Sequence, residues 1–130
     1  MQYARPDGDE ATNSWSPSTG TTLWAVLDDN SETDYITGPD NAGTGGVYLS
    51  TVNDPLVGTG HVLRLRCRAI NASKGPEYIN YKLVQAGVGD ITAYQHEALV
   101  RDTWTTHTYP LKETEANSIT DYAQLTVNFY

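Results

Sequence analysis

A strict alternation of apolar and polar residues between positions 61 and 70 constrains this chain more than any other stretch. The sequence there is HVLRLRCRAI, and in an extended chain its leucines, cysteine and alanine would lie on one face. The opposite face would carry three cations: Arg64, Arg66 and Arg68. Because successive side chains of a strand point to opposite faces, this pattern predicts a half-buried, central strand of a sheet.

The rest of the sequence predicts further short strands separated by turn residues. Strands are expected over residues 21–27, 35–37, 47–52, 77–85, 91–99, 103–109 and 123–130. Turns are expected around Gly87 and Gly89, and a short helical turn is expected within residues 112–118. Seven or eight short strands without helix–strand alternation predict an all-β fold, an antiparallel two-sheet β-sandwich of the jelly-roll type.

The first 20 residues differ from the rest in composition. They are rich in Ser, Thr, Pro, Gly and Asp, and their only aromatic side chains are Tyr3 and Trp15. Ordering so many polar residues costs more free energy than burying two aromatic rings returns. We therefore expect an irregular N-terminal arm over residues 1–20 and a β-sandwich domain over residues 21–130. Tyr3 and Trp15 would hold the arm against the domain's flank or a neighbouring subunit, and deletion of the arm would spare the fold.

The charge of the chain is strongly acidic and unevenly distributed. The net charge is −8, and residues 1–60 contain nine acidic side chains against one base, Arg5, whereas residues 61–130 contain seven of each sign. An acidic surface repels nucleic-acid phosphates, and the chain has no cationic amphipathic helix for an anionic membrane. The N-terminal sequence MQYARPDGDE lacks an apolar segment, so we expect no signal peptide. Neither a nucleic acid nor a membrane is therefore expected as a partner.

Residues with catalytic or metal-binding chemistry are scattered along the sequence. The single cysteine, Cys67, lies on the apolar face of its predicted strand, which favours a buried thiol over a nucleophile. His61, His96 and His107 fall on three different predicted strands, without the close spacing of a zinc site. Residues 28–39 begin like an EF-hand loop but lack its central glycine and its final glutamate. The sequence predicts a protein that is not an enzyme and has no metal or cofactor.

Two sets of side chains are candidates for recognising a partner. The first is the arginine row, Arg64, Arg66 and Arg68. Its positive charges repel one another unless carboxylates of the same sheet or an anionic surface of a partner subunit lie opposite. The candidate carboxylates are Glu77, Glu97 and Asp102. The second set is an aromatic platform like those of sugar-binding modules, although aromatic residues on strands also pack across the sheet. Its members are Tyr78, Tyr94 and Trp104.

The order of several short segments resembles a family of small phage-encoded virion proteins that have a galactose-binding-like or jelly-roll sandwich. The resemblance spans nearly the whole chain, and the order of the segments carries more weight than any single segment. The segments are YARPD (residues 3–7), WSPSTG (15–20), LWAVLD (23–28), DYI (34–36), DP (54–55), GHVLRLR (60–66), WTTH (104–107) and ITDYAQLTV (119–127).

The resemblance implies a structural role without catalytic residues. It suggests a capsid decoration (cement) protein that binds the outer surface of a phage head, with the major capsid protein and neighbouring copies of itself as partners. Tyr3, Arg5 and Trp15 of the arm and the arginine row would then contact the partner. The alternative is a carbohydrate-binding module or a tail-associated adhesion protein that binds host-surface glycans, since one sandwich fold hosts many functions.

Overall fold

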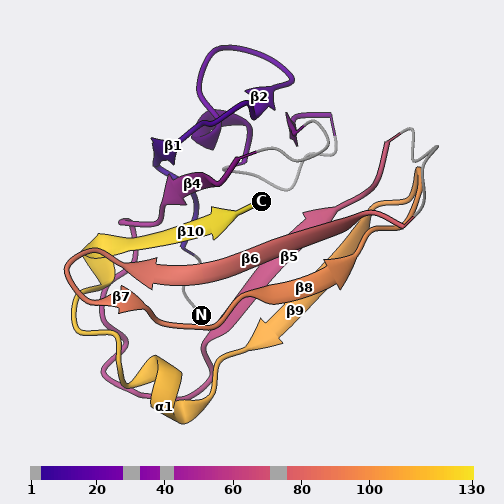
Figure 1. Cartoon of the computed structure of the whole chain (residues 1–130). Helices are drawn as coiled ribbons and strands as arrows, with labels where there is room; N and C mark the ends of the chain where they lie inside the picture. Colours follow the sequence, from indigo (N-terminus) through magenta and orange to yellow (C-terminus); the bar gives the residue numbers. More distant parts are fainter. Residues whose placement is uncertain (1–3, 28–32, 39–42, 71–75) are drawn as a thin grey trace.

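The computed structural model describes residues 4–27, 33–38, 43–70 and 76–130, and these form an antiparallel all-β structure with one very short α-helix (Figure 1). This confirms the predicted fold class. The strands are β1 (Gly8–Ala11), β2 (Ser16–Pro17), β3 (Ile36–Thr37), β4 (Gly45–Tyr48), β5 (Val62–Cys67), β6 (Tyr78–Gln85), β7 (Gly89–Asp90), β8 (Gln95–Ala98), β9 (Thr105–Pro110) and β10 (Leu125–Phe129). The helical elements are η1 (Trp24–Val26), α1 (Glu113–Ala116) and η2 (Tyr122–Gln124).

The largest sheet has six strands. Its order is β1-β4-β10-β6, and both β7 and β8 pair with the remaining edge of β6. The central strand β6 alternates as its sequence predicts, because Ile79, Tyr81 and Leu83 are buried while the residues between them face outward. Gly87 and Gly89 have positive φ angles of 79° and 111°, a conformation that glycine adopts without steric cost, and they turn the chain from β6 into β7 as expected.

The alternating stretch at residues 61–70 contains β5, which lies in a separate two-stranded sheet with β9. Its alternation is confirmed, since Leu63 is buried and Arg64 and Arg66 are exposed. Its expected central position is wrong, because among the described residues β5 pairs along its length only with β9. Alternation reports which face of a strand is buried, but it carries no information about how many neighbours the strand has.

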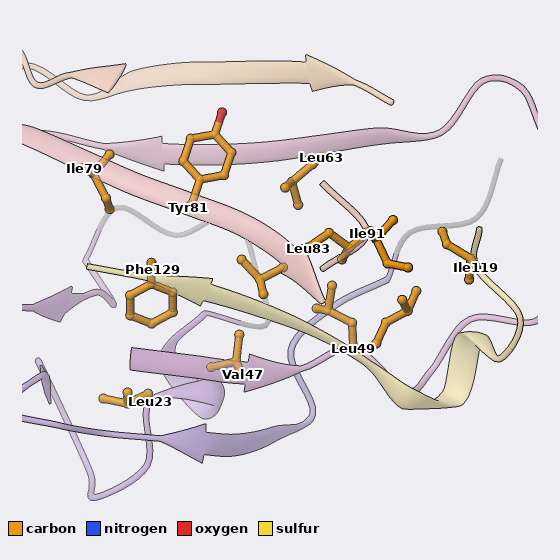
Figure 2. Close-up of a cluster of buried hydrophobic side chains, with 12 residues drawn as sticks. Leu23, Val47, Leu49, Leu63, Ile79, Tyr81, Leu83, Ile91, Ile119 and Phe129 are labelled. Atoms are coloured by element: carbon orange, nitrogen blue, oxygen red, sulfur yellow. The ribbon is translucent and has the colours of Figure 1, made fainter. Parts of the chain in front are cut away.

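The hydrophobic core is formed by the inner faces of these two sheets (Figure 2). Leu63 of β5 joins one buried cluster with residues of β4, β6 and β10, and Leu65, Cys67 and Tyr109 pack against that cluster. The jelly-roll arrangement itself is not confirmed. The described strands form one six-stranded and two two-stranded sheets, whereas a jelly roll places eight strands in two sheets.

The expectation of an irregular N-terminal arm is wrong for residues 8–11. These residues form β1, which pairs with β4 at the edge of the six-stranded sheet, and β2 pairs with β3. The carboxylate of Asp7 accepts hydrogen bonds from the backbone N–H and the hydroxyl of Ser50. Strand pairing and carboxylate bonds to distant backbone groups therefore offset the ordering cost that the polar composition had suggested.

Residues 21–27 were expected to form a strand, but the structure has the 3₁₀ turn η1 there. The carboxylate of Asp9 accepts hydrogen bonds from the N–H groups of Leu23 (3.0 Å) and Trp24 (2.8 Å). Leu23 and Val26, three residues apart, are both buried. A distant carboxylate thus decides the local conformation, because it satisfies donors that the start of a helical turn leaves unpaired.

The remaining predicted elements are present with shifted ends. β6 and β10 match their predicted strands, and residues 113–116 form the helix α1 within the predicted residues 112–118. The described strand β8 begins four residues after the predicted start at residue 91. Within the described ranges, no helix has the length and apolar character needed to cross a lipid bilayer.

Candidate functional site

The arginine row lies on the outer face of the β5–β9 pair. Arg64 is opposite Thr108, and Arg66 donates from Nη1 to the hydroxyl of Thr106 (3.0 Å). The guanidinium carbon of Arg68 lies 4.9 Å from the centre of the Trp104 ring, and the buried Nε–H of Arg68 has no hydrogen-bond partner among the described residues. The described contacts of the row therefore include one threonine hydroxyl and one aromatic ring.

A histidine contacts one of the carboxylates expected to pair with the arginine row. Glu97 Oε2 lies 3.1 Å from Nδ1 of His107 on the inner side of the sheets. This contact leaves the outward-facing arginine row without that carboxylate.

The three members of the predicted aromatic platform do not come together. Tyr78 and Tyr94 lie on the outer face of the six-stranded sheet, where Tyr78 belongs to β6. Trp104 lies directly before β9 of the other sheet and contacts Tyr35 at a centroid distance of 6.2 Å. A continuous sugar-stacking surface over all three rings is therefore not formed.

Four half-exposed tyrosines share the outer face of the six-stranded sheet, and we refer to them as the tyrosine face. Their exposed fractions are 41% for Tyr48, 47% for Tyr78, 38% for Tyr94 and 44% for Tyr130. Three of them lie beside an inward-facing core residue, since Tyr48 follows Val47, Tyr78 precedes Ile79 and Tyr130 follows Phe129, and the fourth, Tyr94, packs against Tyr130. The alternation of β4, β6 and β10 thus brings rings distant in sequence onto one surface.

Polar and aromatic contacts hold the rings of the tyrosine face in place. Tyr78 stacks on His96 with ring centres 4.4 Å apart, and Tyr94 meets Tyr130 edge to face at 5.0 Å. The ammonium of Lys82 lies 4.4 Å from the centre of the Tyr94 ring and forms an ion pair with Asp90 at 2.7 Å. The hydrogen bond to Asp90 is the main cause that raises the pKa of Lys82. These contacts fix the positions of Tyr78, Tyr94 and Tyr130, and Asp90 balances the charge of Lys82.

Sequence reasoning identified Tyr78 and Tyr94 but missed Tyr48, Tyr130 and the supporting His96. The signal was available within each strand, since an aromatic residue directly after a buried apolar one must face outward. The sequence did not contain the order of the strands in the sheet, which places these residues together. Of the other candidates, Arg5 is exposed before β1, and Tyr3 lies outside the described residues.

The side chain of Trp15 packs against residues of its own domain. Its ring meets Phe129 edge to face at 5.0 Å, and its Nε1–H donates to the carbonyl oxygen of Gly43 (2.8 Å). Side chains at Gly38 or Gly45 would collide with the indole, because a Cβ atom there would lie 2.8 or 2.9 Å from its carbons. The glycines therefore form a slot for the ring, which holds the N-terminal segment against the domain's own flank.

The interior contains several polar side chains close to Glu97, among them Cys67, Tyr81 and His107. Burial, reinforced by the charge of Glu97, raises the pKa of the Cys67 thiol to about 11, and the same causes raise the pKa of Tyr81 to about 12. The hydroxyl of Tyr81 and Nε2 of His107 are buried and find no hydrogen-bond partner within the ranges that the structure describes. A nucleophilic cysteine needs a lowered pKa, so this arrangement opposes attack by the thiol.

A cavity of about 450 Å³ opens at the end of the core near the loop before β5. Its walls are apolar side chains from both sheets, including Leu49, Leu63, Leu83 and Leu125, and His61 and Tyr122 add polar groups. Leu49, Leu63 and Leu83 lie at the same end of the core in Figure 2. We call this space the end cavity.

A smaller hollow of about 230 Å³ adjoins the end cavity and shares Val52, Asn53 and Tyr122 with it. The side chains of Asp54 and Asp121 also line this hollow. Burial, and secondly the charge of Asp54, raise the pKa of Tyr122.

Among the described residues, no group of three or more His, Cys, Asp or Glu side chains is placed to hold a metal ion. The EF-hand-like beginning at residues 28–32 lies outside the described residues. No family model, curated protein or solved structure matches this chain. The resemblance to phage virion proteins therefore rests on the sequence segments alone.

Proposed function

We propose that this chain is a non-enzymatic docking protein that binds a protein surface through its tyrosine face. The observation that carries the proposal is the gathering of four half-exposed tyrosines, with a stacked histidine, on one face of the largest sheet. Tyrosine is enriched at protein interfaces and at their energetic hot spots, because it buries a large area with little loss of side-chain entropy.

In the virion setting that the sequence resemblance suggests, the partner is the major capsid protein of an assembled phage head, together with neighbouring copies of this chain. A protein that binds only the assembled shell stabilises that shell by mass action. The preorganised rings support this role, since contacts already fixed in the free protein reduce the entropic cost of binding.

Glycan binding is the second candidate, and the same aromatic face motivates it. The ring contacts favour a protein partner over a sugar. One face of Tyr78 is covered by His96, and one face of Tyr94 is covered by the ammonium of Lys82. Sugar rings stack on open aromatic faces, whereas a protein interface also uses ring edges and hydroxyl groups.

The proposal is tested with purified heads that lack this chain. Tyr78→Ser and Tyr130→Ser, alone and together, should weaken attachment by roughly tenfold or more each if these rings are hot spots. Thr106→Ala and Thr108→Ala on the opposite face are the matched controls and should bind like the natural chain. Equal attachment by all variants would exclude the tyrosine face as the docking surface.

Two further measurements separate the candidate functions. Mass spectrometry of virions from the encoding phage should find many copies per particle for a decoration protein, and a few copies or none would contradict that role. A glycan array probed with the natural chain should give no signal. Saturable binding to one sugar that Tyr78→Ser abolishes, with the fold intact, would favour the glycan function instead.

A further inference from the structure

The end cavity and its acidic neighbour point to a ligand site that is separate from the tyrosine face. The volume of about 450 Å³ lies within the usual range of small-molecule sites. Apolar side chains form most of its wall, so the body of a ligand there would replace water on an apolar surface. The contribution of both sheets to the wall gives the cavity a rigid frame.

The polar groups of the end cavity contain an unsatisfied atom. His61 Nε2 lies 2.6 Å from the hydroxyl of Tyr122, and His61 Nδ1 is buried with no hydrogen-bond partner in the described part of the chain. Buried polar atoms are rarely left unpaired. Nδ1 has almost no accessible surface, so the ligand site depends on the apolar wall of the cavity and on the carboxylates of the hollow, and not on this atom.

The two carboxylates that line the adjoining hollow favour a ligand whose polar group is positively charged. Asp54 Oδ1 accepts from the N–H of Leu56 (2.7 Å), and Asp121 Oδ1 accepts from the N–H of Ala123 (3.0 Å). Each bond uses one carboxylate oxygen and leaves Oδ2 without a partner among the described residues. Two carboxylates beside an apolar chamber favour a cation with an apolar body over a bare metal ion, which needs more ligands.

The loop at the mouth of the cavity exposes two apolar side chains to solvent. Leu56 and Val57 are 86% and 57% exposed, and Leu56 has a positive φ of 58°, which is uncommon for this residue. The hydrogen bond from its N–H to Asp54 supports this conformation. The loop therefore displays two apolar side chains next to the same carboxylate that lines the hollow.

From these features we infer that the end cavity binds a small amphiphilic amine, with its alkyl or aryl body between the two sheets and its ammonium group beside Asp54 and Asp121. The inference does not depend on the proposed docking function, because none of its residues belongs to the tyrosine face.

Calorimetric titration of the full chain at pH 7 tests this site with three probes of equal length. n-Octylamine should bind saturably and raise the melting temperature, n-octanol should bind roughly tenfold more weakly, and octanoate should bind most weakly of the three. Asp54→Asn combined with Asp121→Asn should reduce the affinity for octylamine to that for octanol. Equal affinity of the natural chain for amine and alcohol, or no binding of either, would overturn the inference.

A variant that fills the cavity controls for non-specific attraction of amines to an acidic protein. Val52→Trp keeps the net charge of −8 and adds bulk where the cavity and the hollow meet, so octylamine binding should be lost. If this variant does not fold by circular dichroism, Leu111→Phe places bulk on another wall of the same space. Octylamine binding that persists unchanged in a folded, filled variant would show that the amine binds elsewhere and contradict the site.

Discussion

At the level of single residues, Asp9 shows how an exposed-looking acid acquires a structural role. It belongs to the edge strand β1, and its two carboxylate oxygens accept from consecutive backbone N–H groups at the start of η1. The acidic first half of the chain is therefore not simply a solvated surface, because at least Asp7 and Asp9 pair with the domain's own backbone.

We expect Asp9→Ala to lower the free energy of unfolding by about 1–3 kcal/mol, because it leaves two part-buried N–H groups without acceptors. Asp9→Asn should recover part of the loss, since its amide oxygen accepts one of the bonds. Urea denaturation measures both variants, with the exposed neighbour Glu10→Gln as the control. A loss for Glu10→Gln as large as for Asp9→Ala would show that general charge, and not the cap, is responsible.

Cys67 supplies a prediction about pH. Its pKa is raised from 9.0 to about 11 in the folded protein by burial and by Glu97. Between these values the unfolded chain has lost the thiol proton while the folded chain retains it, so the free energy of unfolding falls as the pH rises from 9 to 11. Tyr81, whose pKa is raised to about 12, acts in the same direction at higher pH.

The measurement compares urea denaturation of the natural chain and of Cys67→Ala between pH 8 and pH 11. Cys67→Ala should lose less stability over this range, although its stability at pH 8 is lower. Alkylation of Cys67 by iodoacetamide at pH 8 should also be slow until the protein is unfolded. Rapid alkylation of the folded chain would contradict the raised pKa.

At the level of elements, the N-terminal segment behaves differently from what its composition suggested. Deletion of residues 1–20 removes β1, β2, the Asp9 cap and the Trp15 ring, and it leaves the edge of β4 unpaired. We therefore expect the truncated chain to lose its cooperative fold, which circular dichroism and thermal unfolding measure. A truncated chain that unfolds cooperatively at the natural melting temperature would restore the arm hypothesis.

A milder change isolates the contribution of the indole. Trp15→Ala should reduce the free energy of unfolding by about 2–4 kcal/mol, because the ring packs against Phe129 and fills the glycine slot. Trp15→Phe keeps the edge-to-face contact but loses the hydrogen bond to Gly43, so it should cost less. An equal cost for both would assign the effect to the hydrogen bond.

At the level of the whole molecule, the two sheets present surfaces of different chemistry. The outer face of the β5–β9 pair carries arginines and threonines, and the outer face of the six-stranded sheet carries the tyrosine face. Attachment through the acidic first half of the chain would weaken with salt, because salt screens charged contacts. On the tyrosine face, however, the charge of Lys82 is balanced by Asp90.

If docking uses the tyrosine face, the dissociation constant should change by less than about threefold between 0.1 and 0.5 M NaCl, because screening affects mainly charged contacts. Surface plasmon resonance against the assembled partner measures this. Arg64→Ala, on the opposite face, should leave both the affinity and its salt dependence unchanged. A steep loss of affinity with salt would instead implicate the acidic first half of the chain or the arginine row.

Local patterns in the sequence determined the fold class, the buried faces of β5, β6 and β10, the turn at Gly87 and Gly89 and the position of α1. These features depend on neighbours a few residues apart, and the alternation of a strand is visible at that range. The tertiary structure alone decided that β5, among the described strands, pairs only with β9, that residues 8–11 form an edge strand and that residues 24–26 form a turn. It also decided that four tyrosines share a face and that His61 and Tyr122 meet beside a cavity. The physical reason is that strand order and carboxylate-to-backbone bonds join residues far apart along the chain, and no local periodicity records such pairings.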